Sequence, residues 1–318
     1  MYSAVDKPKL HNGDLVNIFL SSIFWGLSFP AITIGLNYLN PIFLVLLRFG
    51  LASIIVMFLY PKTLKKVFTN KYLILLGVLN GLGFLLQFMG QESVPAGQAS
   101  IFSNSYVLLV PFFAYFAVGE KMNMRKFVSA FLGLLGIYLI ADNGSRQING
   151  TTDAYFTGVL VFILSAFVWA LYVVLSKRFQ SDSLQNKNFF SLEEVYVSSM
   201  VHSVTVAIFA VFFVQGGKND ILNPFAIASA LFLAIVCSVV PFFLYLKSLK
   251  TVDTTIISII LLFQIIVSFA ISIPFLNESI GLNQIIGATI VFFAMALVSI
   301  ERPTFRWPLR LKRLKKEN

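Results

Sequence analysis

Residues 224–246 read PFAIASALFLAIVCSVVPFFLYL, a run of 23 residues without a charged side chain. A helix needs roughly 20 mostly apolar residues to cross the hydrocarbon core of a bilayer. The run therefore predicts a membrane-spanning helix, and nine other stretches have the same character. The ten predicted spans are 15–37, 41–60, 72–91, 97–118, 124–141, 155–176, 194–215, 224–246, 254–275 and 282–300.

The composition supports the same conclusion for the whole chain. Of its 318 residues, 58% are hydrophobic and 12% are charged, whereas about a quarter of the residues of a soluble domain are charged. The single cysteine, Cys237, excludes an intrachain disulfide framework and a cysteine-based zinc site. The first span is too long for a signal-peptide core and lacks a cleavage site, so we expect it to be retained.

The positive charge lies between the apolar stretches and on one side of them. If the N-terminus is inside, 21 of the 24 Lys and Arg residues fall on the inner side, Arg146 and Lys218 fall outside, and Arg48 lies within a span. Cytoplasmic loops are enriched in Lys and Arg, so both termini are predicted to be cytoplasmic. The net charge of +10 does not indicate nucleic-acid binding, because no basic helix face or aromatic-basic platform is present.

The two halves of the chain resemble each other. Leu20-Ser21 and Trp25-Gly26-Leu27-Ser28 correspond to Leu164-Ser165 and Trp169-Ala170-Leu171-Tyr172 at an offset of 144 residues. Near the end of each half, Glu120, Ser129-Ala130 and Gly136 correspond to Glu278, Gly287-Ala288 and Ala294 at an offset of 158 residues. Because five spans is an odd number, the second half enters the membrane from the opposite side, an architecture typical of secondary transporters.

The predicted fold class is therefore an all-α membrane protein with ten transmembrane helices arranged as two inverted five-helix repeats. The predicted segments are a cytoplasmic N-terminal segment (1–14), a first repeat (15–142), an outer linker (143–154), a second repeat (155–300) and a basic cytoplasmic tail (301–318).

Several short motifs carry a family resemblance: Trp25-Gly26, Pro41 with Arg48, Pro95-Ala96-Gly97, Ala99-Ser100, Gly119-Glu120 and Asn277-Glu278. From about Asp14 to Ile300 the chain resembles the drug/metabolite transporter superfamily, specifically its ten-helix EamA-type permeases. The resemblance implies a two-fold pseudosymmetric helical fold and, commonly, export of amino acids or other small metabolites. Two positions depart from the usual pattern: Asn277 replaces a glycine, and Gln264 lies near the position of a usual proline.

Polar and large aromatic side chains at helical spacing mark the predicted substrate pathway. Lipid cannot solvate polar groups, so these stripes should face the protein interior, where they either pack helices together or line a cavity. The residues predicted to line the pathway are Trp25, Ser28, Arg48, Asn80, Gln87, Ser103, Asn104, Trp169, Tyr172 and Gln264.

Several ionisable groups lie within or next to the predicted spans. Arg48 should not face lipid, and we expect it to contact carbonyls freed by prolines or the amides of the polar stripes. Glu92 and His202 are candidates for proton coupling, with a solvated loop residue and a neutral interhelical histidine as the alternatives. Glu120 and Glu278 are expected to complement the helix dipoles of spans five and ten.

The predicted function is a secondary transporter in the cell membrane, most simply a bacterial or archaeal inner membrane, that exports amino acids or related compounds. The alternatives are efflux of cationic or amphipathic drugs, a channel, and a receptor or scaffold. No clustered nucleophiles, metal ligands or phosphate-binding loop indicate an enzyme, and no cofactor or metal is expected. The expected partners are a small-molecule substrate and the bilayer, with the protein acting as a monomer or homodimer.

Overall fold

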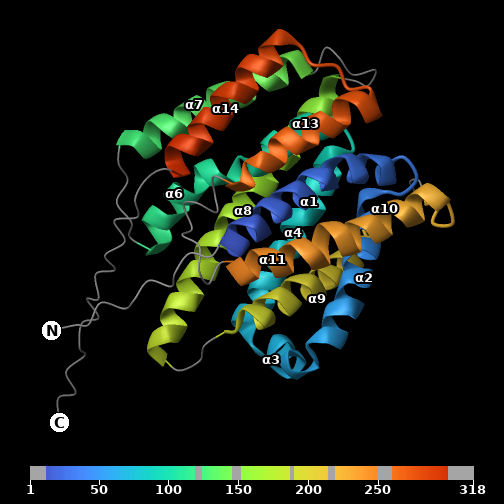
Figure 1. Cartoon of the computed structure of the whole chain (residues 1–318), viewed down its shortest axis with the longest axis vertical. Coiled ribbons are helices and arrows are strands. Elements are labelled where there is room, and N and C mark those ends of the chain that lie inside the picture. The colour runs from blue at the N-terminus through green and yellow to red at the C-terminus, as the bar shows by residue number, and fades with distance from the viewer. Residues whose placement is uncertain are drawn as a thin grey trace.

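A computed structural model of the chain describes residues 12–118, 124–144, 152–186, 190–213, 219–248 and 260–299. These residues form helices with only short connections between them (Figure 1). The helices are α1 (Asn12–Leu36), α2 (Pro41–Leu59), η1 (Pro61–Thr63), α3 (Leu64–Thr69), α4 (Lys71–Gln91), α5 (Ala96–Asn104), α6 (Tyr106–Val118), α7 (Met124–Gly144), α8 (Thr152–Asn186), α9 (Leu192–Val211), α10 (Pro224–Ala234), η2 (Ile235–Val239), α11 (Val240–Ser248), α13 (Phe263–Leu276) and α14 (Leu282–Ser299).

The all-α membrane fold predicted from the sequence is confirmed. Among the described residues, eight helical segments are long and apolar enough to cross a membrane, and they coincide with the first eight predicted spans. The last two predicted spans correspond to the shorter apolar helices Phe263–Leu276 and Leu282–Leu297. Part of the ninth predicted span, residues 254–259, lies outside the described residues. The count of ten spans stays a prediction.

Two of the spans are interrupted. The fourth is divided at Ser105 into α5 and α6, where Ser103, Asn104 and Ser105 follow one another. The eighth contains the π-helical turn η2, followed one residue later by Pro241. Proline has no amide hydrogen, so it cannot donate to the carbonyl one turn earlier. π-helical turns occur frequently at functional sites.

Local sequence signals set several helix boundaries. Pro41 occupies the first turn of α2, and the side chain of Asn40 accepts a hydrogen bond from the amide of Phe43 at 3.0 Å. Ser191 and Glu194 form a reciprocal capping box at the start of α9. The helix α8 continues to Asn186, ten residues beyond the predicted end of the sixth span at residue 176. The short helix α3, between spans two and three, had not been predicted.

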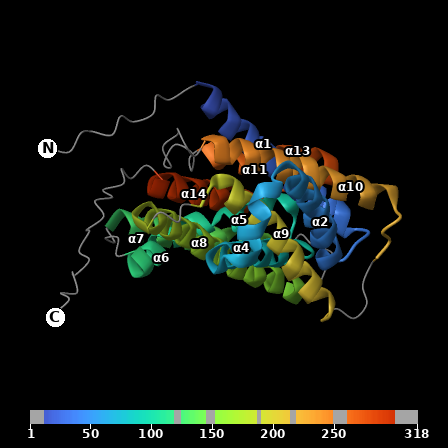
Figure 2. The ribbon, with the colours of Figure 1, turned by 90° about the horizontal axis from the view of Figure 1, so that it is seen from below.

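The helices pack in a pattern with two-fold character. In the second half, α11 and α13 contact α1; in the first half, α4 and α6 contact α8. The helices α2 and α9 pack against each other, as do α7 and α14, which run side by side in Figures 1 and 2. A Cβ atom added to Gly136 would lie 2.7 Å from the carbonyl oxygen of Gly287, and the reverse distance is also 2.7 Å. This reciprocal packing agrees with the repeat, whose inversion in the membrane stays a prediction.

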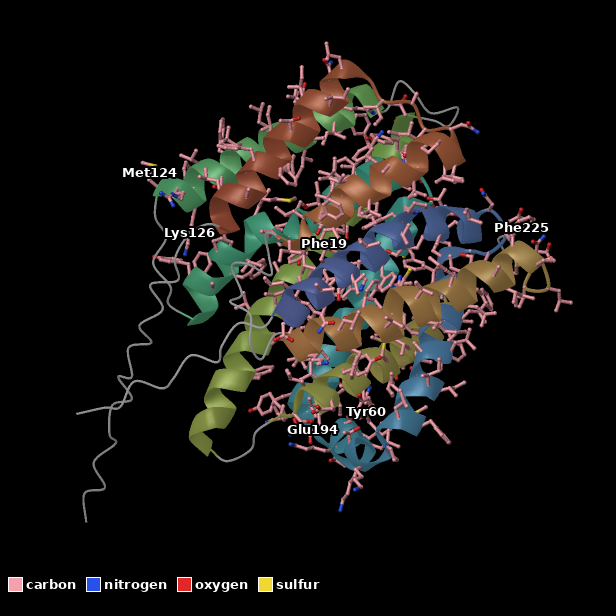
Figure 3. The ribbon with its side chains drawn as sticks, in the orientation of Figure 1. Phe19, Tyr60, Met124, Lys126, Glu194 and Phe225 are labelled. Atoms are coloured by element: carbon pink, nitrogen blue, oxygen red, sulfur yellow. The ribbon has the colours of Figure 1, made fainter. Side chains whose placement is uncertain are left out.

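The outer surface carries many large apolar side chains. Phe58, Phe116, Phe212 and Phe213 each expose more than 80% of their surface. Such exposure suits a hydrocarbon solvent rather than water. Figure 3 places Tyr60 and Glu194 at one end of the bundle, the predicted cytoplasmic end, and Phe225 at the other.

Candidate functional site

A central cavity lies between the two halves, with about 860 Å³ of free space including its open mouth. The helices α1, α2, α4, α5, α6, α8, α9, α11 and α13 contribute to its lining. Nine of the ten residues predicted for the pathway lie on this cavity: Trp25, Ser28, Arg48, Gln87, Ser103, Asn104, Trp169, Tyr172 and Gln264. The structure therefore brings these residues together, and their role in transport stays a prediction.

The two tryptophans have equivalent surroundings in the two halves. The ring of Trp25 meets that of Phe242 edge-on at 5.3 Å, and the ring of Trp169 meets that of Phe84 edge-on at 4.9 Å. Phe84 and Phe242 are themselves separated by 158 residues, the offset that relates Glu120 to Glu278. Each indole thus packs on the matching aromatic residue of the opposite half.

Arg48 of α2 is fully buried and connects the two halves. Its Nε donates to Ser238 Oγ at 2.8 Å and its Nη2 donates to the carbonyl oxygen of Cys237 at 3.0 Å. Cys237 lies four residues before Pro241, so this carbonyl is the one that the proline leaves without its α-helical donor. The expectation that Arg48 binds a proline-freed carbonyl is met, but its second partner is a hydroxyl rather than an amide side chain.

Phenyl rings surround the rest of the guanidinium. Its central carbon lies 5.2, 4.6 and 5.6 Å from the ring centres of Phe49, Phe84 and Phe88. Such contacts stabilise a buried cation through the negative face of the ring. No carboxylate pairs with Arg48 among the described residues.

Two pairs of polar side chains on the cavity are hydrogen-bonded. Ser103 donates to Gln87 Oε1 at 3.3 Å, and Gln264 donates through its amide nitrogen to Asn104 Oδ1. The second pair joins α13 to α5 and therefore crosses between the halves. The other two polar residues of the pathway have local partners: Ser28 donates to the carbonyl oxygen of Trp25, and the Tyr172 hydroxyl lies 3.2 Å from Ser199 Oγ.

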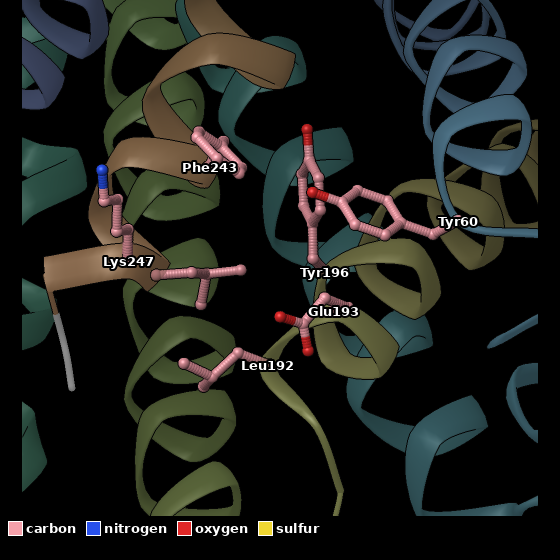
Figure 4. Close-up of a pocket in the computed structure, with 7 residues that line it drawn as sticks. Tyr60, Leu192, Glu193, Tyr196, Phe243 and Lys247 are labelled. Atoms are coloured by element: carbon pink, nitrogen blue, oxygen red, sulfur yellow. The ribbon is translucent and has the colours of Figure 1, made fainter. Parts of the chain in front are cut away.

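A second pocket lies between the central cavity and the predicted cytoplasmic end. It is lined by Tyr60, Leu192, Glu193, Tyr196, Phe243, Leu246 and Lys247 (Figure 4). Tyr196 and Leu246 line both this pocket and the central cavity. The Tyr196 hydroxyl donates to the carbonyl oxygen of Val239 at 2.8 Å, which fixes the ring against the π-helical segment. The side chains of Tyr196 and Leu246 therefore lie between the central cavity and the second pocket.

At the opposite end, hydrogen bonds join the two halves. The carboxylate of Glu278 accepts hydrogen bonds from the amides of Ala96 at 2.5 Å and Gly97 at 3.0 Å, at the start of α5. Burial raises the pKa of Glu278, while the two backbone hydrogen bonds oppose that rise. The sequence prediction for Glu278 was wrong in one respect: this carboxylate complements the N-terminus of α5 rather than that of α14. Glu120 lies outside the described residues.

Three predicted site residues lie away from the cavity. Asn80 does not line it, because its amide nitrogen donates to the Ser199 carbonyl at 3.1 Å and to Ser203 Oγ at 2.9 Å, joining α4 to α9. Glu92 is exposed at the C-terminal cap of α4. The His202 ring nitrogen lies 3.2 Å from the carbonyl oxygen of Val67 in α3. This geometry favours a helix-packing role for Asn80, a loop position for Glu92 and an interhelical contact for His202.

The sequence did not single out the aromatic walls of the cavity. Phe84, Tyr106, Tyr196, Phe242 and Tyr245 all line it. With 34 Phe and 11 Tyr in the chain, one more ring in an apolar span carries little information. The offset of 158 residues could have linked Phe84 to Phe242. The described residues hold no cluster of three or more His, Cys, Asp or Glu that could bind a metal ion.

The described helices form a bundle of apolar, membrane-spanning segments around a central cavity, and comparison with known proteins identifies a multi-pass membrane transporter. A family model, the EamA-like transporter family, matches residues 14–141 and 156–300. The chain belongs to this family. The two matched segments fall on the two predicted halves, although the division into five segments stays a prediction.

Similar proteins extend over almost the whole chain. An uncharacterized transporter of Archaeoglobus fulgidus is 25% identical over 290 residues, covering 89% of this chain and 96% of the relative. A protein of Escherichia coli named "Probable amino-acid metabolite efflux pump" is 22% identical, covering 87% of this chain and 92% of the relative. One crystal structure matches with a TM-score of 0.62 and 15% identity, covering 91% of this chain and 96% of the other. That likeness supports the fold.

Proposed function

We propose that the protein is a secondary transporter that exports small metabolites, amino acids or related compounds, from the cytoplasm by alternating access. The observation that carries the proposal is the central cavity between the two halves, on which nine predicted pathway residues converge. Substrate sites of inverted-repeat transporters lie near the membrane midplane at such an interface. The name of the Escherichia coli relative supports the export of amino-acid metabolites.

The contacts at the two ends suggest how access would alternate. Toward the predicted cytoplasmic end, only Tyr196 and Leu246 are shared between the cavity and the inner pocket. Toward the other end, Glu278 binds the start of α5 and Gln91 donates to the carbonyl oxygen of Phe29 at 2.6 Å. This arrangement corresponds to a conformation closed on the outside. Opening there would require Glu278 to release α5.

The proposal includes the orientation and the location. Both termini are cytoplasmic, the membrane is the cell membrane, and the protein acts as a monomer or a homodimer. The positive charge of the segments between spans supports this orientation, because 21 of 24 cations would lie inside.

A vesicle experiment tests the function. Proteoliposomes that contain the purified full-length protein are loaded with a mixture of amino acids, N-acylated amino acids and organic acids. The solutes that leave the vesicles are measured with and without a pH gradient. We expect the release of a small set of solutes at least tenfold faster than from protein-free vesicles. Equal release of every solute from both kinds of vesicle would contradict the proposal.

A further inference from the structure

Three buried nitrogen atoms around the central cavity have no hydrogen-bond partner: Trp25 Nε1, Trp169 Nε1 and Arg48 Nη1. Buried donors without acceptors are rare in native proteins, so each calls for an explanation. All three groups can only donate, since neither an indole N–H nor a guanidinium has an acceptor. Three unsatisfied donors from separate helices on one cavity indicate a ligand that supplies acceptors.

The charge around the cavity indicates that the ligand is an anion. Arg48 is completely buried, and neither its partners nor the described residues that line the cavity include an Asp or a Glu. Charged side chains within spanning helices pair with one another or with backbone carbonyls, as Arg48 does with Cys237, and they mark substrate paths. Nε and Nη2 of Arg48 are used in the protein, which leaves Nη1 for the ligand.

The rest of the lining defines the body of the ligand and offers no carboxylate to pair with an ammonium group. The rings of Trp25, Tyr106, Tyr172, Phe242 and Tyr245 provide apolar and aromatic walls. Two amide oxygens on the cavity each accept one hydrogen bond within the protein, Gln87 Oε1 from Ser103 and Asn104 Oδ1 from Gln264. A substrate ammonium would find only neutral acceptors and no carboxylate among the described residues that line the cavity.

We propose that Arg48, Trp25 and Trp169 bind the carboxylate of the transported molecule, and that the substrate is an organic acid with an aromatic or bulky apolar body and no free amino group. This inference rests on the proposed function, because it assigns the substrate class of the same cavity. Deaminated or N-acylated derivatives of large apolar amino acids have this chemistry.

Entry of the carboxylate requires side-chain movements. The three nitrogen atoms are covered in this structure, so the ligand must displace a ring to reach them. Phe84 contacts both sides of the site: its ring centre lies 4.6 Å from the Arg48 guanidinium carbon and 4.9 Å from the Trp169 ring. Displacement of Phe84 would open the space beside Arg48 and Trp169, whereas Trp25 packs on Phe242 and Tyr245, so one of these two rings would also have to move.

A matched ligand series tests the substrate class. The probes are 3-phenylpropionate, its methyl ester, phenylalanine and phenethylamine, which share one phenethyl body and differ in charge. Binding to the full-length protein in lipid nanodiscs is measured by calorimetry. We expect 3-phenylpropionate to bind at least tenfold more tightly than the other three, because only it has a carboxylate without an ammonium. Equal or tighter binding of phenethylamine or phenylalanine would overturn the proposal.

Two conservative variants test the donors themselves. Trp25→Phe and Trp169→Phe remove the N–H group and keep an aromatic ring, so they should fold. Each should weaken 3-phenylpropionate binding about tenfold, the effect of losing one hydrogen bond to a charged group. Tyr38→Phe, which removes the polar hydrogen of a ring outside the cavity, is the matched control and should not change binding. Unchanged affinity in both tryptophan variants would exclude their role as donors.

The vesicle experiment separates this inference from the proposed function. If metabolites are transported but 3-phenylpropionate neither binds nor competes, the anion site is wrong and the transporter proposal stands. If 3-phenylpropionate binds but no solute crosses the membrane, the anion site stands and the transporter proposal is wrong. If neither occurs, both are contradicted.

Discussion

Arg48 donates a hydrogen bond to the carbonyl oxygen of Cys237, which lies 3.0 Å from its Nη2 and four residues before Pro241. The proline frees this carbonyl, and an arginine from the other half of the chain binds it. The same guanidinium reaches Ser238 Oγ through Nε, so two of its nitrogens hold α2 to the π-helical segment. This relationship fixes one wall of the cavity.

The first prediction is that lysine cannot replace Arg48. A lysine ammonium is a point charge on a shorter side chain. It cannot present the two-donor fork that binds Cys237 and Ser238 together. Arg48→Lys should lower the free energy of unfolding in detergent by about 2 kcal/mol, the range for hydrogen bonds to a charged group. Thermal unfolding measures this. Arg125→Lys, at an exposed position of α7, is the control, and equal stability of both variants would refute the bridging role.

Glu278 gives a prediction of pH dependence. Because burial raises its pKa in the folded protein, the folded state holds the proton more tightly than the unfolded state does. The contribution of this group to stability is then largest at low pH and falls as pH rises through its folded pKa. Glu278→Gln should flatten the dependence of melting temperature on pH above about 4, where an ordinary glutamate loses its proton. The same slope in wild type and variant would show that another group causes it.

Removing the carboxylate of Glu278, whose two oxygens are hydrogen-bond acceptors, should have a different effect from the Gln substitution. Glu278→Ala leaves the amides of Ala96 and Gly97 without their side-chain partner. We expect a loss of about 2 kcal/mol in stability, since two bonds to a carboxylate are lost. If outer closure depends on this contact, the variant should also make the outer end more reactive to thiol reagents at an introduced cysteine. Unchanged stability and reactivity together would exclude Glu278 as an outer closure.

Much of the fold and part of the site could be predicted from the sequence. Ser28, Gln87 and Asn104 were placed on the cavity because lipid cannot solvate polar side chains, so their helix face had to be interior. The same reasoning failed for Asn80, which lies seven residues before Gln87 on α4. Two helical turns keep both on one side of the helix, yet the cavity ends between them and Asn80 meets α9 instead.

Tertiary contacts account for what the sequence could not supply. The hydrogen bond between Gly97 and Glu278 joins residues 181 positions apart. From the sequence, Glu278 was expected to complement the nearest helix along the chain, which is the tenth span. Phe84 and Tyr245 gave no signal, since aromatic residues are common in every span. Which rings meet at the cavity depends on how the helices rotate against one another.

Topology can be tested at exposed positions of the structure. Cysteines introduced at Lys65 and Lys247 should react with a membrane-impermeant maleimide only from the cytoplasm, and those at Asp153 and Asp220 only from outside. All four side chains are exposed, and the native Cys237 is buried. Labelling of Lys247→Cys from outside would contradict the inverted second half.

Glu92→Gln should not alter the pH dependence of transport. The carboxylate is exposed at the end of α4 and does not line the cavity, so it has no route to the substrate. Transport in proteoliposomes at several imposed pH gradients measures this. Loss of gradient-driven transport with substrate binding preserved would restore Glu92 as a coupling residue.

The most direct test of the cavity as the transport pathway is solute release from vesicles that contain Trp25→Ala, Trp169→Ala or both. These residues occupy equivalent positions on the cavity and pack on Phe242 and Phe84. We predict that each single variant inserts normally and transports at least tenfold more slowly, since a missing indole removes both wall and donor. Release at the wild-type rate from the double variant would show that both tryptophans only pack helices and that the pathway lies elsewhere.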